Sequence, residues 1–222
     1  NGFKRSSQGY DYTLYYLDGE LEDLEVPNVT CLILSLFSKA SPFKGRDYLP
    51  NTASLLQFIK SMQLKSGEIQ YSSKRKHYQG PQYNAFQLLF LSEYNSYFPS
   101  EEILEIISKI AKYLEVSVNI EGKVSYGSKK WGLNVSKRHI VYHSAALSAA
   151  LSVAANLLEN KNKSLVNKLN SYVLSQQREG GSYPFGEKAL FGLFDDVLPY
   201  YRYVSYTSNL ILLSEFSENN IQ

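Results

Sequence analysis

Tyrosine is the most unevenly placed residue type in this chain, and it is the first candidate for chemistry. Fourteen of the 19 tyrosines fall in four stretches that hold 94 of the 222 residues: 2–30, 67–83, 122–143 and 181–206. The same stretches contain the single tryptophan, all three histidines and four of the six arginines. Exposed loops are normally rich in small polar residues, so this concentration predicts an aromatic, hydrogen-bonding functional surface. The alternative is a lid whose local core the tyrosines form.

A phenol or imidazole beside an arginine can remove a proton next to a carboxylate. The guanidinium neutralises the carboxylate, and the phenol or imidazole acts as base or acid. A nearby arginine also lowers the pKa of a tyrosine toward the useful range. We therefore predict four catalytic residues that converge on one pocket: Tyr142, His143, Arg202 and Tyr206. The alternative is that Tyr142 and His143 are a packed pair at a helix start, and that the arginines are structural.

Other residues of the four stretches are predicted to bind the ligand. Aromatic faces with phenol hydroxyls suit a sugar, which has C–H faces and a rim of hydroxyls. The predicted binding residues are Tyr71, His77, Tyr83, Tyr126, Trp131, Arg138, Asp195 and Asp196. Adjacent carboxylates rarely face the same point, so Asp195 and Asp196 are a poor acid–base pair for glycoside hydrolysis. Turn formation is their alternative role.

The composition excludes several classes of protein. A net charge of +2 is too balanced for a dedicated nucleic-acid binder. A single cysteine cannot form an internal disulfide, and Cys31 lies in an apolar segment where a metal ligand is not expected. No apolar run reaches the length of a membrane span. No glycine-rich phosphate loop is present, and we expect neither a metal nor a cofactor.

A repeat of 55 to 59 residues organises the chain. Three segments align without gaps: FIKSMQLKSGEIQY (58–71), YLEVSVNIEGKVSY (113–126) and YVLSQQREGGSYPF (172–185). Each has an aromatic residue, a glycine nine positions later and a second aromatic four positions after that. A period of this length indicates one supersecondary unit that is used several times.

Two kinds of predicted helix alternate along this repeat. Segments 51–63, 101–115 and 164–177 each carry one apolar stripe at helical spacing, which indicates a helix with one wet face. Segments 29–37, 83–91, 143–158 and 206–216 are apolar nearly all round, which indicates a buried helix. The alternation predicts an all-α fold, an α/α toroid with four inner and three outer helices in an incomplete ring. A solenoid of stacked hairpins is the alternative.

The predicted ring is a single domain over residues 1–222. The chain starts with Asn1 and lacks one outer helix, so we expect an upstream segment of the same protein, with a possible upstream domain. Parallel inner helices would point their N-termini at the face that carries the four long stretches. Their partial positive charge, together with Lys137, Arg138, His143 and Arg202, favours an anionic ligand.

The repeat resembles known toroidal enzymes. KSMQLKSGEIQY (60–71) and VLSQQREGGSYPF (173–185) are similar to the glutamine–glycine repeat of terpenoid cyclases and protein prenyltransferases. The aspartate-rich cyclase motif is absent. The chain also resembles α/α-barrel carbohydrate enzymes, namely unsaturated-glycuronyl hydrolases, polysaccharide lyases and the C-terminal domain of glucuronyl C5-epimerases. YRYVSYTSNLILL (201–213) is similar to the helix start of the epimerases, which implies roles for Arg202 and Tyr206.

Three functional hypotheses follow. The first is a carbohydrate-active toroid that binds or acts on an acidic, uronate-containing oligosaccharide. If it is an enzyme, we expect proton abstraction of the lyase or epimerase type in preference to glycoside hydrolysis. The second is a non-catalytic module that binds a glycan or a protein. The third is an isoprenoid-handling toroid, which needs an apolar central cavity with an acidic cluster at its opening.

Overall fold

The structure is a computed structural model. It describes residues 3–6, 8–13, 15–17, 20–22, 25–44, 52–72, 80–125, 129–130, 133–134, 139–159, 163–184, 186 and 207–214.

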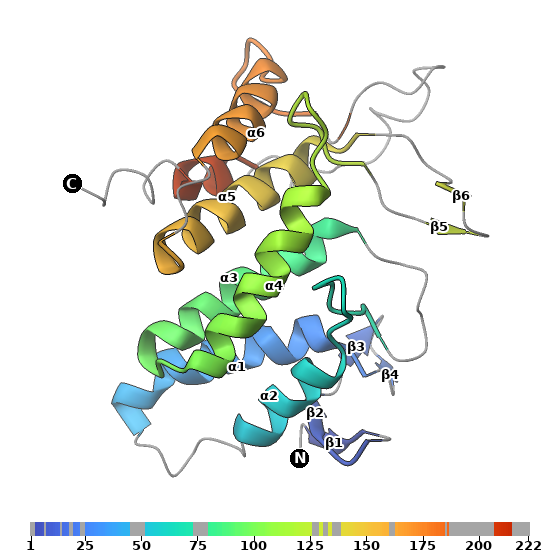
Figure 1. The fold of residues 1–222 in the computed structure, drawn as a ribbon, viewed down its shortest axis with the longest axis vertical. Helices are drawn as coiled ribbons and strands as arrows, with labels where there is room; N and C mark the ends of the chain where they lie inside the picture. The colour runs from blue at the N-terminus through green and yellow to red at the C-terminus, as the bar shows by residue number, and fades with distance from the viewer. Residues whose placement is uncertain are drawn as a thin grey trace.

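The inner layer consists of parallel helices that lie side by side. They are α1 (Pro27–Lys44), α3 (Pro81–Tyr97), α5 (Val141–Leu157) and a helix over residues 207–214. Helix α3 packs against α1 on one flank and α5 on the other. Each of α1, α3 and α5 begins at the same end of the molecule (Figure 1). These are the segments that the sequence predicts as apolar on all sides, and this prediction is confirmed.

The outer layer consists of the amphipathic helices α2 (Thr52–Ser61), α4 (Glu101–Val116) and α6 (Lys163–Ser175). Helix α2 packs on α1, α4 on α3 and α5, and α6 on α5. In α4 the buried side chains are Ile103, Ile106, Ile107, Ile110, Ala111 and Leu114. Their spacing of three and four residues places them along one stripe, and that stripe is the face that the inner helices cover.

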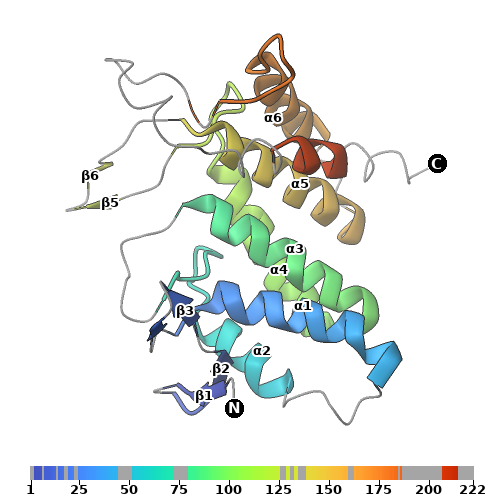
Figure 2. The same cartoon turned by 180° about the vertical axis from the view of Figure 1, so that it is seen from behind.

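The described helices form an open arc, as both views show (Figures 1 and 2). Helix α1 lies toward one end of the long axis, and the helix over 207–214 lies near the other, beside α5 and α6. Leucines remain exposed at both ends, with Leu36 of α1 51% exposed and Leu212 50% exposed. The fold is an all-α, incomplete α/α toroid, as the sequence predicts.

The repeated glycines close one type of turn. In the first copy, Leu64 N donates to Glu68 O and Gly67 N donates to Leu64 O. The same two hydrogen bonds recur around Gly122 and Gly181. In each copy the residue three positions before the glycine donates to the residue that follows the glycine, and the glycine N donates back to it. All three glycines have positive φ, from 77° to 92°, a conformation that favours glycine over any residue with a Cβ. The aligned glycines therefore mark equivalent structural positions.

A fourth copy of this turn lies at Gly9, where sequence alignment does not find it. Ser6 N donates to Tyr10 O, Gly9 N donates to Ser6 O, and φ of Gly9 is 83°. The side chain four residues before the glycine also repeats its contact. Gln63 and Gln177 donate from Nε2 to the carbonyls of Gly67 and Gly181, and Arg5 donates to that of Gly9. Thr13 stands four positions after this glycine, where the other copies have an aromatic residue, and this hides the motif in the sequence.

The connections contain short antiparallel strand pairs that the sequence analysis does not predict. β1 (Phe3–Arg5) pairs with β2 (Asp11–Thr13), β3 (Tyr15–Leu17) with β4 (Glu20–Glu22), and β5 (Lys129–Lys130) with β6 (Leu133–Asn134). Strands of two or three residues are too short for an alternating pattern to show. In the part of the chain that the structure describes, no helix has the length and apolarity to cross a membrane.

Candidate functional site

The candidate site lies where the inner helices begin. We call it the mouth, and define it as the first three turns of α1, α3 and α5 on the face turned away from the outer helices. None of these helices has an acidic residue in its first turn. The residues that precede α3 and α5, Gly80 and Ile140, make no side-chain capping hydrogen bond. The first N–H groups and the positive dipole ends of α3 and α5 therefore lack a compensating side chain from these positions.

The connections are held to the outer side of these helix starts. Asn84 accepts a hydrogen bond from Ile69 N at 2.7 Å and donates to Ile69 O at 3.3 Å. Thr30, at the same position of α1, lies 3.2 Å from the hydroxyl of Thr13. Residues two apart on a helix are separated by about 200°. Gln82 consequently projects on the side of α3 opposite to Asn84, toward the mouth.

An aromatic row lines the mouth. Phe86 lies one turn beyond Gln82 on the same face, and its ring is 5.9 Å from that of Tyr142 on the neighbouring helix. Phe90 continues the row at 6.3 Å from Phe86, with the rings nearly parallel. All three side chains are partly buried. Tyr142 is predicted from the sequence and Phe86 is not, although the spacing of four residues between Phe86 and both Gln82 and Phe90 is visible in the sequence.

Two other predicted residues form a second aromatic contact. The rings of Tyr71 and Tyr83 are 4.9 Å apart and inclined at 58°. Tyr71 follows the Gly67 turn, and Tyr83 is the third residue of α3. Both are half-buried. The contact ties the connection to the start of an inner helix, which fits either a binding role or a packing role.

His143 is a neutral imidazole at physiological pH. Its side chain is only 2% exposed, and burial lowers its pKa from 6.5 to about 3. The positive charge that the sequence analysis assigns to His143 is therefore absent near neutral pH, because a charged imidazole loses its hydration in this position. The ring lies 6.0 Å from that of Tyr142. His143 supports Tyr142 by packing.

The remaining predicted site residues lie outside the described residues. They are His77, Tyr126, Trp131, Arg138, Asp195, Asp196, Arg202 and Tyr206. The predicted convergence of four catalytic residues is thus visible for its first pair, Tyr142 and His143. Convergence on Arg202 and Tyr206 stays a prediction.

Two carboxamides at the mouth occupy equivalent positions. Asn28 is the second residue of α1 and Gln82 is the second residue of α3, where α5 has Tyr142. Asn28 Oδ1 and Gln82 Oε1 are both buried without a hydrogen-bond partner. Gln82 folds back over its own helix start, since a Cβ on Gly80 would lie 1.8 Å from its Oε1. The sequence analysis assigns no role to Gln82, because a glutamine at a helix start carries no recognisable signal.

The described residues hold no group of three or more histidine, cysteine, aspartate or glutamate side chains that could bind a metal ion. Cys31 is fully buried in α1, and burial raises the pKa of its thiol far above the usual value. A buried, protonated thiol is a poor metal ligand and a poor nucleophile. The acidic opening that the isoprenoid hypothesis needs is likewise not found among the described residues.

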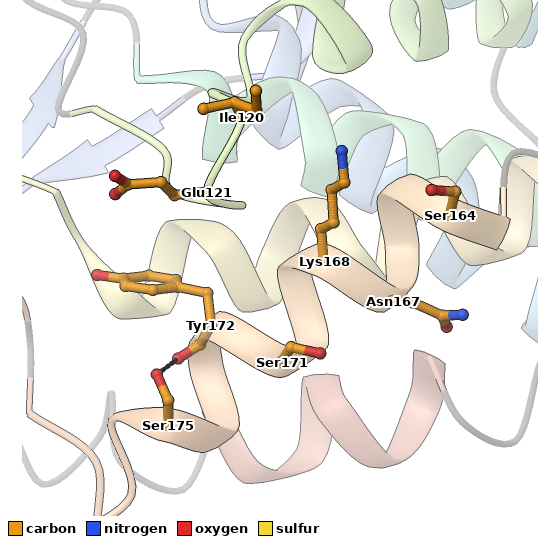
Figure 3. A pocket seen from close by; sticks show the side chains of 8 residues that line it. All are labelled: Ile120, Glu121, Ser164, Asn167, Lys168, Ser171, Tyr172 and Ser175. Atoms are coloured by element: carbon orange, nitrogen blue, oxygen red, sulfur yellow. Dashed lines mark hydrogen bonds between the residues drawn. The ribbon is translucent and has the colours of Figure 1, made fainter.

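A separate hollow of about 710 Å³ lies on the outer layer, between the Gly122 turn and α6 (Figure 3). It is lined by Ile120, Glu121, Ser164, Asn167, Lys168, Ser171, Tyr172 and Ser175. Lys123 pairs with Glu121 at 2.7 Å and lies 5.8 Å from the centre of the Tyr172 ring. None of the predicted site residues lines this hollow, so we place the candidate site at the mouth.

Comparisons with known proteins support the fold. No protein-family model matches the sequence, and no curated protein matches it. The structure is similar to a solved structure described as a possible member of the GH105 family from Salmonella enterica serovar Paratyphi A. That match has a TM-score of 0.71 and 10% identity, and covers 100% of this chain and 63% of the other.

A second similar structure is described as glycosyl hydrolase family 88 from Bacteroides vulgatus. It has a TM-score of 0.66 and 12% identity, and the match covers 87% of this chain and 62% of the other. This chain therefore spans less than two thirds of the length of either neighbour. At such low identity the likeness shows the shared fold, and the arrangement of described helices is that of an α/α toroid like those of the GH105 and GH88 structures.

Proposed function

We propose that this chain is a carbohydrate-active α/α-toroid domain that binds or acts on an acidic, uronate-containing oligosaccharide at the mouth. The observation that carries the proposal is the meeting of two features there. The aromatic row of Phe86, Phe90 and Tyr142 offers a face for sugar rings. The starts of α3 and α5 present the positive ends of their helix dipoles, without side-chain caps at Gly80 and Ile140, to a carboxylate or hydroxyl oxygen.

The two structural neighbours add weight to a sugar ligand, because one is described as a possible member of the GH105 family and the other as glycosyl hydrolase family 88. Their names leave the reaction of this chain open. Our proposal is proton abstraction at a uronate, as in a lyase or an epimerase. Tyr142 is the base or acid in it, and Arg202 and Tyr206 assist at the substrate carboxylate. Arg138, Trp131 and Tyr126 are proposed to bind the sugar.

Within this proposal Tyr142 is a better catalytic candidate than His143. A base with a pKa of about 3 is weak at neutral pH, and the His143 ring is almost completely buried. The Tyr142 ring is half-buried and packs on Phe86. His143 is therefore proposed to position Tyr142.

The experiment that tests the function is a thermal-shift screen followed by product analysis. Oligosaccharides of galacturonate and glucuronate, their neutral counterparts and farnesyl diphosphate form the panel. A ligand at about 100 times its dissociation constant adds roughly 2.7 kcal/mol of stability. We expect a shift with the uronates. A shift with farnesyl diphosphate alone would contradict the proposal.

Product analysis separates the reactions. A lyase forms a C4–C5 double bond, an epimerase incorporates solvent deuterium at C5, and a hydrolase adds water and releases a reducing end. Tyr142→Phe keeps the ring that packs on Phe86 and removes the hydroxyl. We expect it to lower kcat by about 100-fold or more, with substrate binding changed only a few-fold. Binding without any product would support the non-catalytic module.

A second candidate has one observation in its favour. The rings of Phe86 and Phe90 follow one another along the inner helix at 6.3 Å, and such an apolar surface also suits an isoprenoid chain. The same panel decides between the two, because it contains a prenyl diphosphate beside the sugars.

A further inference from the structure

We propose that Asn28 and Gln82 recognise hydroxyl groups of the sugar at the mouth, so that the two carboxamide oxygens accept hydrogen bonds from it. The assignment rests on the proposed function and names the groups that would select the ligand.

The first argument is the place of the two residues in the repeat. Asn28 and Gln82 are each the second residue of an inner helix, and α1 and α3 pack side by side and start at the same end (Figure 2). The repeat thus places two carboxamides at equivalent positions of the mouth. The third equivalent position is held by Tyr142, whose phenol is also a hydrogen-bonding group.

The second argument is that these oxygens are buried and unused. Asn28 Oδ1 and Gln82 Oε1 have no hydrogen-bond partner, and the Gln82 residue is only 7% exposed. The two buried asparagines of α3 are engaged, Asn84 with Ile69 and Asn95 with Ser100 N, whereas Gln87 is not. A buried acceptor without a partner destabilises the fold. Two such acceptors at equivalent positions of the mouth indicate that a ligand supplies the missing donors.

The third argument is the chemistry that these acceptors require. An oxygen acceptor needs an O–H or N–H donor. A prenyl chain has none, and a diphosphate at neutral pH offers mainly acceptors. A sugar presents several hydroxyl donors on its rim and C–H groups on its faces. Phe86 lies one turn from Gln82 on the same face and contacts Tyr142. The C–H face of the sugar would pack on the Phe86 ring while a sugar hydroxyl donates to Gln82.

Gln87 provides a matched control in the same helix. Both its Oε1 and its Nε2 are buried without a partner, whereas in Gln82 only Oε1 is, and the Gln87 residue is 0% exposed. Five residues correspond to about 140° of rotation from Gln82, so Gln87 lies on a flank of α3 and not on the side of Gln82. Leucine is similar in size to both glutamines and forms no hydrogen bond.

The test compares Gln82→Leu, Asn28→Leu and Gln87→Leu in the complete 222-residue chain. The probes are the uronate oligosaccharides of the panel and their neutral counterparts, with binding measured by calorimetry. We expect Gln82→Leu and Asn28→Leu each to weaken sugar binding about fivefold to tenfold, the usual loss for one hydrogen bond. Neither should lower the melting temperature of the free protein. Gln87→Leu should raise the melting temperature and leave the dissociation constant within about twofold of wild type.

Deoxy ligands give a second test that does not depend on the stability of a variant. One sugar hydroxyl is expected to donate a hydrogen bond to Gln82. Its removal should weaken binding to the wild-type protein and leave binding to Gln82→Leu unchanged, which is the sign of a direct contact. Equal losses in both proteins for every deoxy position would overturn the assignment, as would variants that bind like wild type. If the wild-type protein binds no sugar of the panel, the proposed function itself fails, and this inference fails with it.

Discussion

At the scale of single residues, the buried polar groups of the inner helices decide both stability and chemistry. His143, Gln82 and Gln87 are all at least nine-tenths buried. The first has a lowered pKa, and the other two have carboxamide atoms without a partner. Such groups cost folding free energy. The two glutamines differ in this from the buried Asn84 and Asn95 of the same helix, whose carboxamides have hydrogen-bond partners.

The lowered pKa of His143 makes stability depend on pH. The unfolded chain binds a proton at this imidazole below pH 6.5, and the native chain does so only below about pH 3. The unfolded state therefore binds more protons between these values, and the free energy of unfolding falls as the pH falls. The slope from this group approaches about 1.4 kcal/mol per pH unit at the centre of the interval.

His143→Leu removes that titration. Chemical denaturation of both proteins at several pH values between 4 and 7 measures the effect, and we expect a flatter dependence for the variant whatever its absolute stability. An unchanged slope would show that the native imidazole titrates near its ordinary pKa.

Gln87 should be replaceable with a gain in stability. Both polar atoms of its carboxamide are buried and without partners, so the native state carries an uncompensated desolvation cost. We expect Gln87→Leu to raise the free energy of unfolding by about 1 kcal/mol, as measured by urea denaturation. A loss of more than about 1 kcal/mol would mean that the carboxamide has a partner that matters to the fold.

At the scale of elements, two of the four glycine turns contact the next outer helix. A Cβ on Gly67 would lie 2.0 Å from the carbonyl oxygen of Lys109 in α4, and one on Gly122 would lie 2.4 Å from that of Lys168 in α6. The Gly67 and Gly122 turns therefore pack directly against the backbone of the next outer helix. At Gly181 the nearest atom is the Gln177 side chain at 3.9 Å, and at Gly9 there is none within 4 Å.

The four equivalent glycines make a graded mutational series. Each has positive φ, so alanine costs about 1 kcal/mol at any of them. Gly67→Ala and Gly122→Ala must also displace a helix backbone. We expect these two to destabilise the protein by at least 2 kcal/mol more than Gly181→Ala and Gly9→Ala do. Equal losses at all four positions, in thermal or urea unfolding, would contradict the seating of the turns.

At the scale of the whole molecule, the arc has a centre and two ends. Helix α3 packs against α1, α4 and α5, whereas α1 and the helix over 207–214 keep exposed leucines at the ends of the described arc. Local opening of a protein starts where fewest contacts are lost. The cooperative core of this chain is therefore expected in α3 and in the part of α5 that packs against α3.

Amide hydrogen exchange tests this expectation. We expect the amides in the middle of α3 to exchange most slowly, and those of residues 207–214 to exchange at least tenfold faster. When a uronate oligosaccharide is added and binds, amide exchange should slow in the first turns of α1, α3 and α5. Protection that is uniform across all inner helices would indicate an arc that unfolds as one cooperative unit.

The sequence by itself determined the layers of this protein. Apolarity on all sides marked α1, α3 and α5 as inner helices, a single stripe marked α4 as an outer one, and the spaced glycines marked the turns. These features repeat locally, and burial in a helical layer imposes a period that a sequence must follow. Tyr142 was found in the same way, because it stands at the start of a buried segment.

Only the tertiary structure decided what meets at the mouth. The contact of Phe86 with Tyr142 joins two helices whose residues are 56 positions apart, and the neutral state of His143 follows from what surrounds it. Gln82 and Gln87 are the same residue type in one helix, yet one faces the mouth and the other a flank. Burial, pKa and access depend on neighbours distant in the chain, and a single sequence does not specify them.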